Sequence, residues 1–269
     1  MPVITISRGT FSGGKDLAEC LAGRLGSPCL SREVIAEAAA QYGVSQEALG
    51  GALSQAPSFW QRFGRERDHY LAYIRAVLCQ HARTGQLIYH GLGGHHLLAG
   101  IRHVIRVRVV ADLSYRIRAA MAQRHMSSGQ AETYINKVDE DRRKWTRFLY
   151  GVAWEDASNY DAVLNLEYLG VAGACEVVMR LTQLEPFQPT AESQAAMQNL
   201  ALASLVTAAL ARDPRTCDSD VRVRADAGSV TLEGLVRLAP AVMAAAEVAA
   251  AVEGVAAVAN HVVTTELGL

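Results

Sequence analysis

A glycine-rich stretch near the N-terminus has the residue types and spacing of a phosphate-binding loop. Residues 9–16 read GTFSGGKD, which follows the pattern G-x-x-x-x-G-K. Glycines let backbone N–H groups turn toward phosphate oxygens, and the start of a following helix adds partial positive charge. Lys15 can then reach the terminal phosphates as a mobile cation. The residues expected to bind the phosphates of a nucleotide are Gly9, Ser12, Gly13, Gly14, Lys15 and Asp16.

The residue after this lysine departs from the usual pattern. Such loops commonly place Ser or Thr there to hold Mg²⁺, whereas this chain has Asp16. A carboxylate can bind Mg²⁺ directly or through water, which makes Asp16 a candidate metal ligand. Aspartate also favours the start of a helix by itself. A glycine turn that enters a helix without binding a nucleotide is therefore the alternative interpretation.

The segments around the loop alternate between apolar strands and helical patterns. The expected strands are 3–6, 86–90, 104–110 and 160–165, and the expected helices are 17–25, 31–42, 65–84, 113–150 and about 171–184. This alternation predicts an α/β fold with a parallel sheet flanked by helices, in which ligands bind at the carboxyl ends of the strands. The loop at 9–16, the glycines at 91–94 and Asn165 all follow strands in this way.

The chain after residue 191 has a different composition and a different order of elements. Residues 186–191 contain two prolines and predict a linker between a domain at 1–185 and a second domain at 192–269. The second domain is expected to hold a helix at 192–212, strands at 221–226 and 229–234, a helix at 239–252 and a strand at 255–265. This αββαβ order predicts a small α+β domain.

Taken together, the motifs in residues 3–184 resemble those of the cytidylate-kinase-like family of P-loop nucleotide kinases. The matching segments are 4–8, 12–15, 91–94, 111–116, 137–142, 154–156 and 160–165. Their order and spacing are more specific than any single motif. The resemblance implies a P-loop kinase fold, with ATP and Mg²⁺ used to move the γ-phosphoryl group to a nucleoside monophosphate such as CMP.

The resemblance also implies roles for individual side chains. Lys15 and Arg142 would be catalytic, because both can neutralise charge on the transferring phosphoryl group. The residues implied to bind the acceptor are Gly91, Gly93, Arg116, Arg124, Asp139 and Arg142. For each arginine taken singly, a solvated helix surface is the alternative.

One departure from the family pattern bears on activity. The family usually carries an arginine at the position of Leu92, where it would grip the acceptor phosphate. Its loss removes a charge-assisted contact worth roughly 2–3 kcal/mol. A second hypothesis is therefore a nucleotide-binding regulatory protein with little or no turnover, and a third is a structural association protein with an empty loop.

The segment 192–267 resembles a BON domain. The matching motifs are 209–213, 228–234, 254–255 and 258–260. Such domains are described as binding or association units, some at membranes and some with ions. The resemblance therefore implies a protein, ion or membrane-surface partner, and the alanine-rich helix at 239–252 is compatible with a homo-oligomer.

Net charge, apolar stretches and cysteine spacing limit the partners, metal sites and locations that can be expected for this chain. The net charge of −1 offers no basic field for nucleic acid, so no nucleic-acid partner is expected. We see no signal peptide and no uninterrupted apolar stretch of the roughly 18 residues that span a bilayer. The five cysteines lack a C-x-x-C pair, which argues against zinc and against a disulfide framework. A cytoplasmic location is therefore expected.

Two groups of side chains near these motifs have ambiguous roles. His90, His95 and His96 are expected to border the acceptor cleft or to lie on the surface rather than to bind a metal. Trp145 and Trp154 can stack on a base, but packing in the core or in a lid over the cleft is the expected role.

Overall fold

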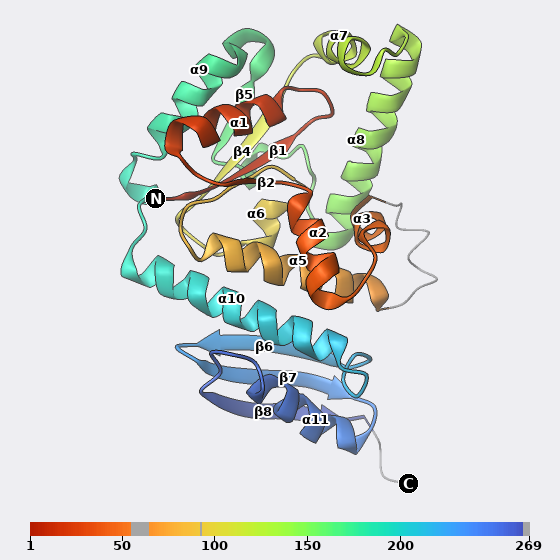
Figure 1. Cartoon of the computed structure of the whole chain (residues 1–269), viewed down its shortest axis with the longest axis vertical. Coiled ribbons are helices and arrows are strands. Elements are labelled where there is room, and N and C mark those ends of the chain that lie inside the picture. The colour runs from red at the N-terminus through yellow and green to blue at the C-terminus, as the bar shows by residue number, and fades with distance from the viewer. Residues whose placement is uncertain (55–64, 92, 266–269) are drawn as a thin grey trace. The chain divides into compact units, whose positions relative to one another are not determined.

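A computed structural model describes residues 1–54, 65–91 and 93–265 (Figure 1). The chain packs as two compact units. The first holds Met1–Glu33 and Thr84–Thr190. The second combines the chain from Ala191 onward with three earlier helices, α2 (Glu33–Tyr42), α3 (Gln46–Ser54) and α5 (Glu66–Ala82). The domain boundaries drawn from the sequence at 185 and 192 stay a prediction.

The first unit is built on a parallel sheet. Within the described residues its strands are β1 (Val3–Arg8), β2 (Cys29–Leu30), β3 (Ile88–Tyr89), β4 (Val104–Val110) and β5 (Ala162–Asn165), in the order β2-β3-β1-β4-β5. In the central strand, Ile4 pairs with Ile88 on one side and Ile105 on the other. All pairs are parallel, so the carboxyl ends of the strands share one edge. The predicted α/β fold is confirmed.

Helices α1 (Gly14–Leu25), α6 (Gly94–Leu97) and α9 (Leu166–Leu181) pack on this sheet and bury its apolar side chains. Helices α7 (Leu113–Arg124) and α8 (Ser128–Tyr150) pack on each other, and short 3₁₀ turns lie at Ala157–Asn159 and Glu185–Phe187. Helices α1 and α9 lie side by side in Figure 1 and pack on the strands through Leu17, Leu21 and Val178. This packing fixes the helix that follows the glycine loop.

Several element boundaries differ from those expected, for local reasons. The helix expected at 113–150 is two helices, because Ser127 and Gln130 form a capping box that starts α8. The element α9 is interrupted at Gly170, whose φ of 63° and ψ of 172° are not helical, so the regular helix follows this residue, as expected near residue 171. The turn before the kink begins at Leu166, where the side chain of Asn165 accepts a hydrogen bond from the Glu167 N–H at 3.1 Å. Strand β2 and helices α3 and α6 were not expected from the sequence.

The second unit contains the predicted αββαβ order. Its elements from Ala191 onward are α10 (Ala191–Arg212), β6 (Asp220–Asp226), β7 (Ser229–Val236), α11 (Ala239–Ala250) and β8 (Ala257–Thr264). Strand β7 pairs antiparallel with β6 and parallel with β8. Val230 and Leu232 are fully buried beneath the two helices, with Val206, Ala245 and Ala249. These side chains form the apolar core of the elements that follow Ala191.

Helix α10 packs along α5 within this unit. The Ser204 hydroxyl donates to the Cys79 sulfur at 3.7 Å, and a ring nitrogen of His69 lies 2.8 Å from the Cys217 carbonyl oxygen. The segment Glu185–Arg212 is long and apolar enough to cross a membrane, with a mean hydropathy of 1.2. One such helix is weak evidence for a membrane span, and 33% of the most apolar 18-residue window is buried by the fold, including Met197, Ala201 and Val206.

Candidate functional site

The glycine loop connects the carboxyl end of β1 to the first turn of α1. Gly13 caps the helix in the left-handed region, with φ 83°. The buried Ser12 hydroxyl donates to the Gly9 carbonyl oxygen at 2.8 Å, and its backbone N–H donates to the same oxygen at 3.2 Å. Ser12 therefore holds the loop in shape. The N–H groups of the first turn of α1 have no partner inside the helix and face the end of the loop.

Glycine is required at position 13 by the positive φ of its backbone and at position 14 by close packing. A Cβ atom on Gly13 would lie 2.9 Å from Cδ2 of Leu166, and one on Gly14 would lie 2.6 Å from Cδ of Arg8. Real Cβ atoms do not approach other atoms so closely. The loop backbone therefore lies bare against its neighbours, and this is the arrangement that lets backbone N–H groups surround phosphate oxygens.

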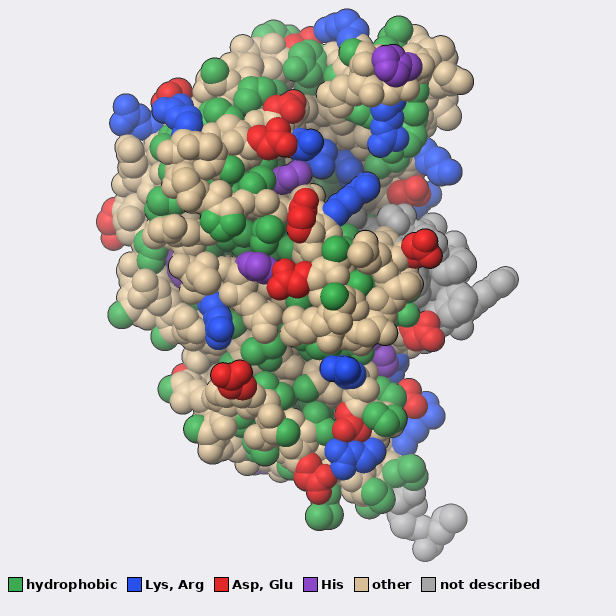
Figure 2. All heavy atoms as spheres, in the orientation of Figure 1, with side chains coloured by type: hydrophobic (Ala, Val, Ile, Leu, Met, Phe, Trp, Pro, Cys, Tyr) green, Lys and Arg blue, Asp and Glu red, His purple; other side chains and the backbone are tan. Residues whose placement is uncertain are grey.

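A cavity of about 470 Å³ opens beside this loop, and cationic side chains dominate its charged lining. The cations that line it are Arg8, Lys15, Arg32, Arg124 and Arg142, and the carboxylates are Asp16 and Asp141. Figure 2 shows Lys and Arg side chains gathered around a hollow on this face of the first unit. Five cations against two carboxylates make a cavity suited to a polyanion.

Crowding of these cations changes their acidity. Burial, opposed by Asp139 and reinforced by Arg8 and Arg116, lowers the pKa of Arg142 to about 10. Burial also lowers the pKa of Arg8, with a contribution from Arg32. Both guanidinium groups stay charged at neutral pH. A bound phosphate would relieve their mutual repulsion, because each cation then gains a counter-charge.

Thr10 of the loop is held by a buried group of charges from α7 and α8. Its N–H and hydroxyl donate to Oδ1 of Asp139 at 3.1 and 2.7 Å. Arg116 forms an ion pair with the other Asp139 oxygen and donates from Nε to the Thr10 carbonyl oxygen at 2.8 Å. Arg142 donates to the Thr10 hydroxyl at 3.0 Å and to the Arg8 carbonyl oxygen at 2.9 Å. These contacts tie the loop to both helices.

Comparison with known families assigns the two segments of the chain. Residues 3–168 match the model of the cytidylate kinase-like family, and residues 199–266 match the BON domain. The chain belongs to the cytidylate kinase-like family. It also carries a C-terminal BON domain. No curated protein matches the chain.

Solved structures share the fold of the kinase-like segment. A crystal structure of an uncharacterized protein from Eubacterium ventriosum superposes with a TM-score of 0.55 at 17% identity, over 68% of this chain and 99% of that chain. The shikimate kinase from Bacteroides thetaiotaomicron gives 0.43 at 11% identity over 68% and 99%. The shikimate kinase from Acinetobacter baumannii in complex with shikimate gives 0.40 at 14% over 68% and 93%.

The cavity beside the glycine loop is lined by only some of the site residues expected from the sequence. Those that line it are Gly13, Gly14, Lys15, Asp16, Arg124 and Arg142. Lys15 forms an ion pair with Glu19 at 3.3 Å, and Arg124 lies 4.9 Å from the ring centre of Tyr134. Gly9, Ser12, Arg116 and Asp139 support the loop without lining the cavity. The roles assigned to all these residues stay predictions.

The expected acceptor side is less fully described. Gly91 and Gly93 follow β3 but do not line the cavity of the loop. A Cβ atom on Gly91 would lie 2.4 Å from the hydroxyl oxygen of Tyr89, so this turn is also closely packed. Leu92, the departure from the family pattern, lies outside the described residues.

Sequence reasoning missed two cations of the cavity, Arg8 and Arg32. Arg8 ends β1 and was read only as part of a family motif. In a parallel sheet the carboxyl end of each strand lies at the edge where ligands bind. The position of Arg8 at the end of the first expected strand was therefore the signal that could have identified it. Arg32 lies just before α2, where a single arginine has no distinctive pattern.

The histidines after β3 are more buried than expected. His90 and His95 are 7% and 6% exposed, which excludes the surface position considered for them. Burial lowers the pKa values of His90 and His96 to about 4, and burial together with the neighbouring His96 lowers the pKa of His95 to about 3. His96 stacks on Tyr150 with ring centres 4.3 Å apart. All three rings are therefore neutral at pH 7.

The two tryptophans pack within the protein. Trp154 donates from Nε1 to the Ser7 hydroxyl at 2.9 Å, and the Arg108 guanidinium lies 4.3 Å from its ring centre. Trp145 is 2% exposed and also lines the cavity of the loop. Trp154 has the expected packing role. Trp145 is packed in the same way and also forms part of the cavity wall.

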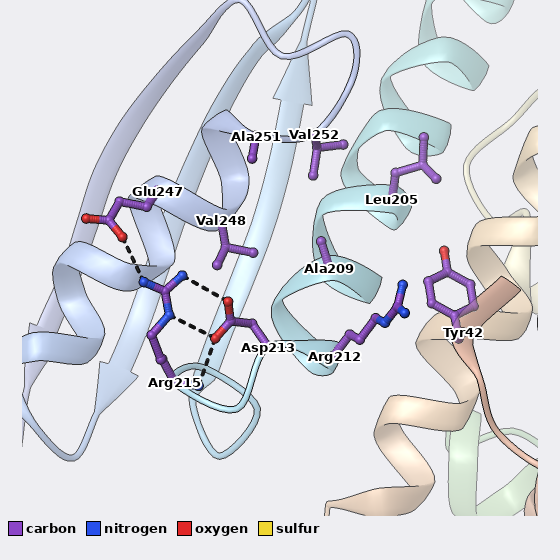
Figure 3. A pocket seen from close by; sticks show the side chains of 10 residues that line it. All are labelled: Tyr42, Leu205, Ala209, Arg212, Asp213, Arg215, Glu247, Val248, Ala251 and Val252. Carbon is purple, nitrogen blue, oxygen red and sulfur yellow. Dashed lines mark hydrogen bonds and ion pairs between the residues drawn. The ribbon is translucent and has the colours of Figure 1, made fainter.

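The second unit has a cavity of its own, of about 570 Å³ (Figure 3). Apolar side chains of α10 and α11 form one wall, among them Leu205 and Val248. Arg215 is held by Asp213 at 2.9 Å and Glu247 at 2.8 Å. Arg212 points toward Tyr42 and has no hydrogen bond or ion pair within the described part of the chain. The BON segment thus contributes to a cavity with one unpaired cation.

Proposed function

We propose that the chain is a phosphotransferase that moves the γ-phosphoryl group of ATP to a nucleoside monophosphate of the CMP type, in the cytoplasm. The observation that carries this proposal is the group of five cations around the glycine loop, one of which, Lys15, occupies the phosphate-contacting place of the loop pattern. Phosphoryl transfer needs positioning and charge neutralisation more than covalent chemistry, and this lining supplies both.

On the donor side, the loop would bind the phosphates of ATP, neutralise their charge and hold Mg²⁺. The backbone of Gly13 and Gly14 and the first turn of α1 donate hydrogen bonds to the β- and γ-phosphates. Lys15 leaves Glu19 and neutralises the transferring group, which is easy because an exposed pair of this kind is worth only about 0.3–0.5 kcal/mol. Asp16, which lines the cavity, would hold Mg²⁺, and the ion would supply charge neutralisation for the phosphates.

On the acceptor side, Arg142 has the central role. Its guanidinium lines the cavity while also holding Thr10, so it can contact both phosphate groups without moving the loop. Arg124 adds a second cation to the cavity. Asp139 and Arg116 hold Arg142 and the loop in position through their ion pair and hydrogen bonds. A phosphate acceptor is already a nucleophile, so its attack needs no general base. Gly91 and Gly93 are proposed to border the acceptor on the β3 side.

Release of ADP from Mg-ATP tests this proposal. The protein is offered a panel of nucleoside monophosphates, CMP and dCMP first. We expect acceptor-dependent ADP release that falls at least roughly 100-fold in Lys15→Ala. Lys144→Ala is the matched control, because Lys144 is an exposed lysine that pairs with Glu140 and does not line the cavity. Equal rates in the two variants would remove the loop from the reaction.

A second candidate function is a nucleotide-binding regulatory protein that has little turnover and acts through its BON domain on a protein, ion or membrane surface. The unpaired Arg212 beside an apolar wall favours it, because a binding unit needs such a site. This function predicts that ATP raises the melting temperature by an amount set by RT ln(1 + [L]/Kd), with no ADP released to any acceptor. Release of ADP with an acceptor would decide for the kinase.

A further inference from the structure

Two cysteines of the first unit place their sulfur atoms in contact. Cys20 lies on α1 and Cys175 on α9, and their Sγ atoms are 2.7 Å apart. Both are free thiols. The residues are 155 positions apart in the chain, so this contact is made by the packing of the two helices and not by local sequence. Cys29, the third cysteine of this unit, has no sulfur partner among the described residues.

The surroundings give the two thiols different access. Cys175 is fully buried, while Cys20 is half-buried and open to a small reagent. Burial and the neighbouring Cys20 raise the pKa of the Cys175 thiol to about 11, although the nearby Arg24 guanidinium opposes this rise. Arg24 is itself anchored by an ion pair with Glu176. Cys20 is therefore the thiol that meets an incoming oxidant, and Cys175 is the one that follows.

We propose that Cys20 and Cys175 are a modification site, which closes to a reversible disulfide when the protein meets a small disulfide oxidant such as oxidised glutathione. The Cys20 thiolate attacks one sulfur of the oxidant, forms a mixed disulfide and releases one glutathione thiolate. The Cys175 sulfur then attacks the Cys20 sulfur, releases the second glutathione and gives up its proton to that leaving thiolate. Two protein thiols lose two electrons, and the oxidant gains both.

The disulfide would join the two helices that support the glycine loop. Helix α1 begins within the loop at Gly14, and Leu166 at the start of α9 packs on Gly13. Closing a loop of this length restricts the unfolded chain strongly, so the oxidised protein should be more stable. Neither cysteine lines the cavity beside the loop. Nucleotide affinity should therefore change little on oxidation, which separates this site from the proposed activity.

The test treats the full chain with oxidised glutathione, then blocks free thiols, unfolds and digests it with trypsin. Mass spectrometry should find a crosslinked pair of the peptides 16–24 and 148–180, which dithiothreitol separates. The melting temperature should rise by roughly 5 °C or more and return on reduction. The matched control is Cys29→Ser, another half-buried cysteine, which should keep both effects.

Cys20→Ser and Cys175→Ala should lose the crosslink and the rise in melting temperature, with the reduced melting temperature of each variant measured to show that it folds. Glutathione attached to Cys20 with no crosslink would overturn the proposal, as would a crosslink that persists in Cys20→Ser or one that uses Cys29. Failure of the ADP-release experiment would leave this result untouched, because the readout is the covalent bond itself.

Discussion

At the scale of single residues, Asp139 is the group on which the loop depends most. It is 6% exposed, accepts two hydrogen bonds from Thr10 and pairs with Arg116. A buried carboxylate is stable only while its partners satisfy it, and here the same partners also shape the loop. Removing its charge would leave the Arg116 and Arg142 guanidinium groups without their shared counter-ion.

We therefore expect Asp139→Asn to lower the free energy of unfolding by about 3 kcal/mol and to weaken ATP binding. Urea unfolding and nucleotide titration measure the two effects. Glu140→Gln is the neighbouring control, because the side chain of Glu140 is about half exposed and, among the described residues, pairs with Arg143 and Lys144 near the surface. Its effect should stay within about 0.5 kcal/mol. A similar loss in both variants would contradict the buried network.

The neutral histidines make stability depend on pH. In the folded protein the pKa values of His90 and His95 are about 4 and about 3, below the ordinary value of 6.5. Below pH 6.5 these histidines are therefore protonated in the unfolded chain but stay neutral in the folded chain, which favours unfolding. Stability should fall by roughly 2–4 kcal/mol between pH 7 and pH 5. Urea unfolding at several pH values measures this slope.

Substitution identifies the source of the slope. His95→Gln should flatten the slope, because it removes one of the histidines whose pKa is lowered in the folded protein. His261→Gln, at an exposed position on β8, should leave it as it is. A slope that is equally steep in His95→Gln and the unaltered chain would assign the pH dependence to other groups.

At the scale of elements, helix α1 offers a direct comparison between two glycines. Gly13 sits at its cap with a positive φ and against Leu166, whereas Gly23 lies inside the helix with nothing within 4 Å of a Cβ atom. Gly13→Ala should cost roughly 2 kcal/mol and weaken ATP binding. Gly23→Ala should stabilise the protein by up to about 1 kcal/mol, since alanine is the better helix former. Thermal unfolding of both variants checks the opposite signs.

The sequence was informative about elements where the pattern is local. Glycine spacing predicted the loop, an apolar run predicted β1, and alternating apolar residues predicted β4. Strand β2 has two residues, too few for any alternation to register. The position of Arg8 in the cavity depends on the sheet edge, and the contact between Cys20 and Cys175 on helix packing. Such long-range features leave no local pattern to read.

At the scale of the whole molecule, the chain does not pack strictly in sequence order. Helices α2, α3 and α5 fall inside the predicted N-terminal domain, yet they cluster with the elements that follow Ala191. No periodicity in residues 33–82 predicts this, because helix packing against a distant segment has no signature in either segment alone. The buried side chains of α5, including Ile74, Val77 and Leu78, need the completed unit around them.

Shortening the chain to residues 1–190 should therefore destabilise what remains. It removes α10 and with it the partner of α5 in the Ser204–Cys79 and His69–Cys217 contacts. We expect the melting temperature to fall by more than roughly 5 °C and the protein to aggregate more readily. Differential scanning fluorimetry and light scattering measure both. An unchanged melting temperature would mean that the sequence boundary at 185 is a complete folding boundary.

The same arrangement sets a timetable for folding on the ribosome. Helix α5 is finished at Ala82, more than a hundred residues before α10 begins at Ala191. At a synthesis rate of about 5–20 residues per second, α5 waits roughly 5–20 seconds for its partner to emerge. During that interval its apolar side is open to the nascent chain's surroundings. Helix α5 is then a segment to which a chaperone that binds exposed apolar helices could attach.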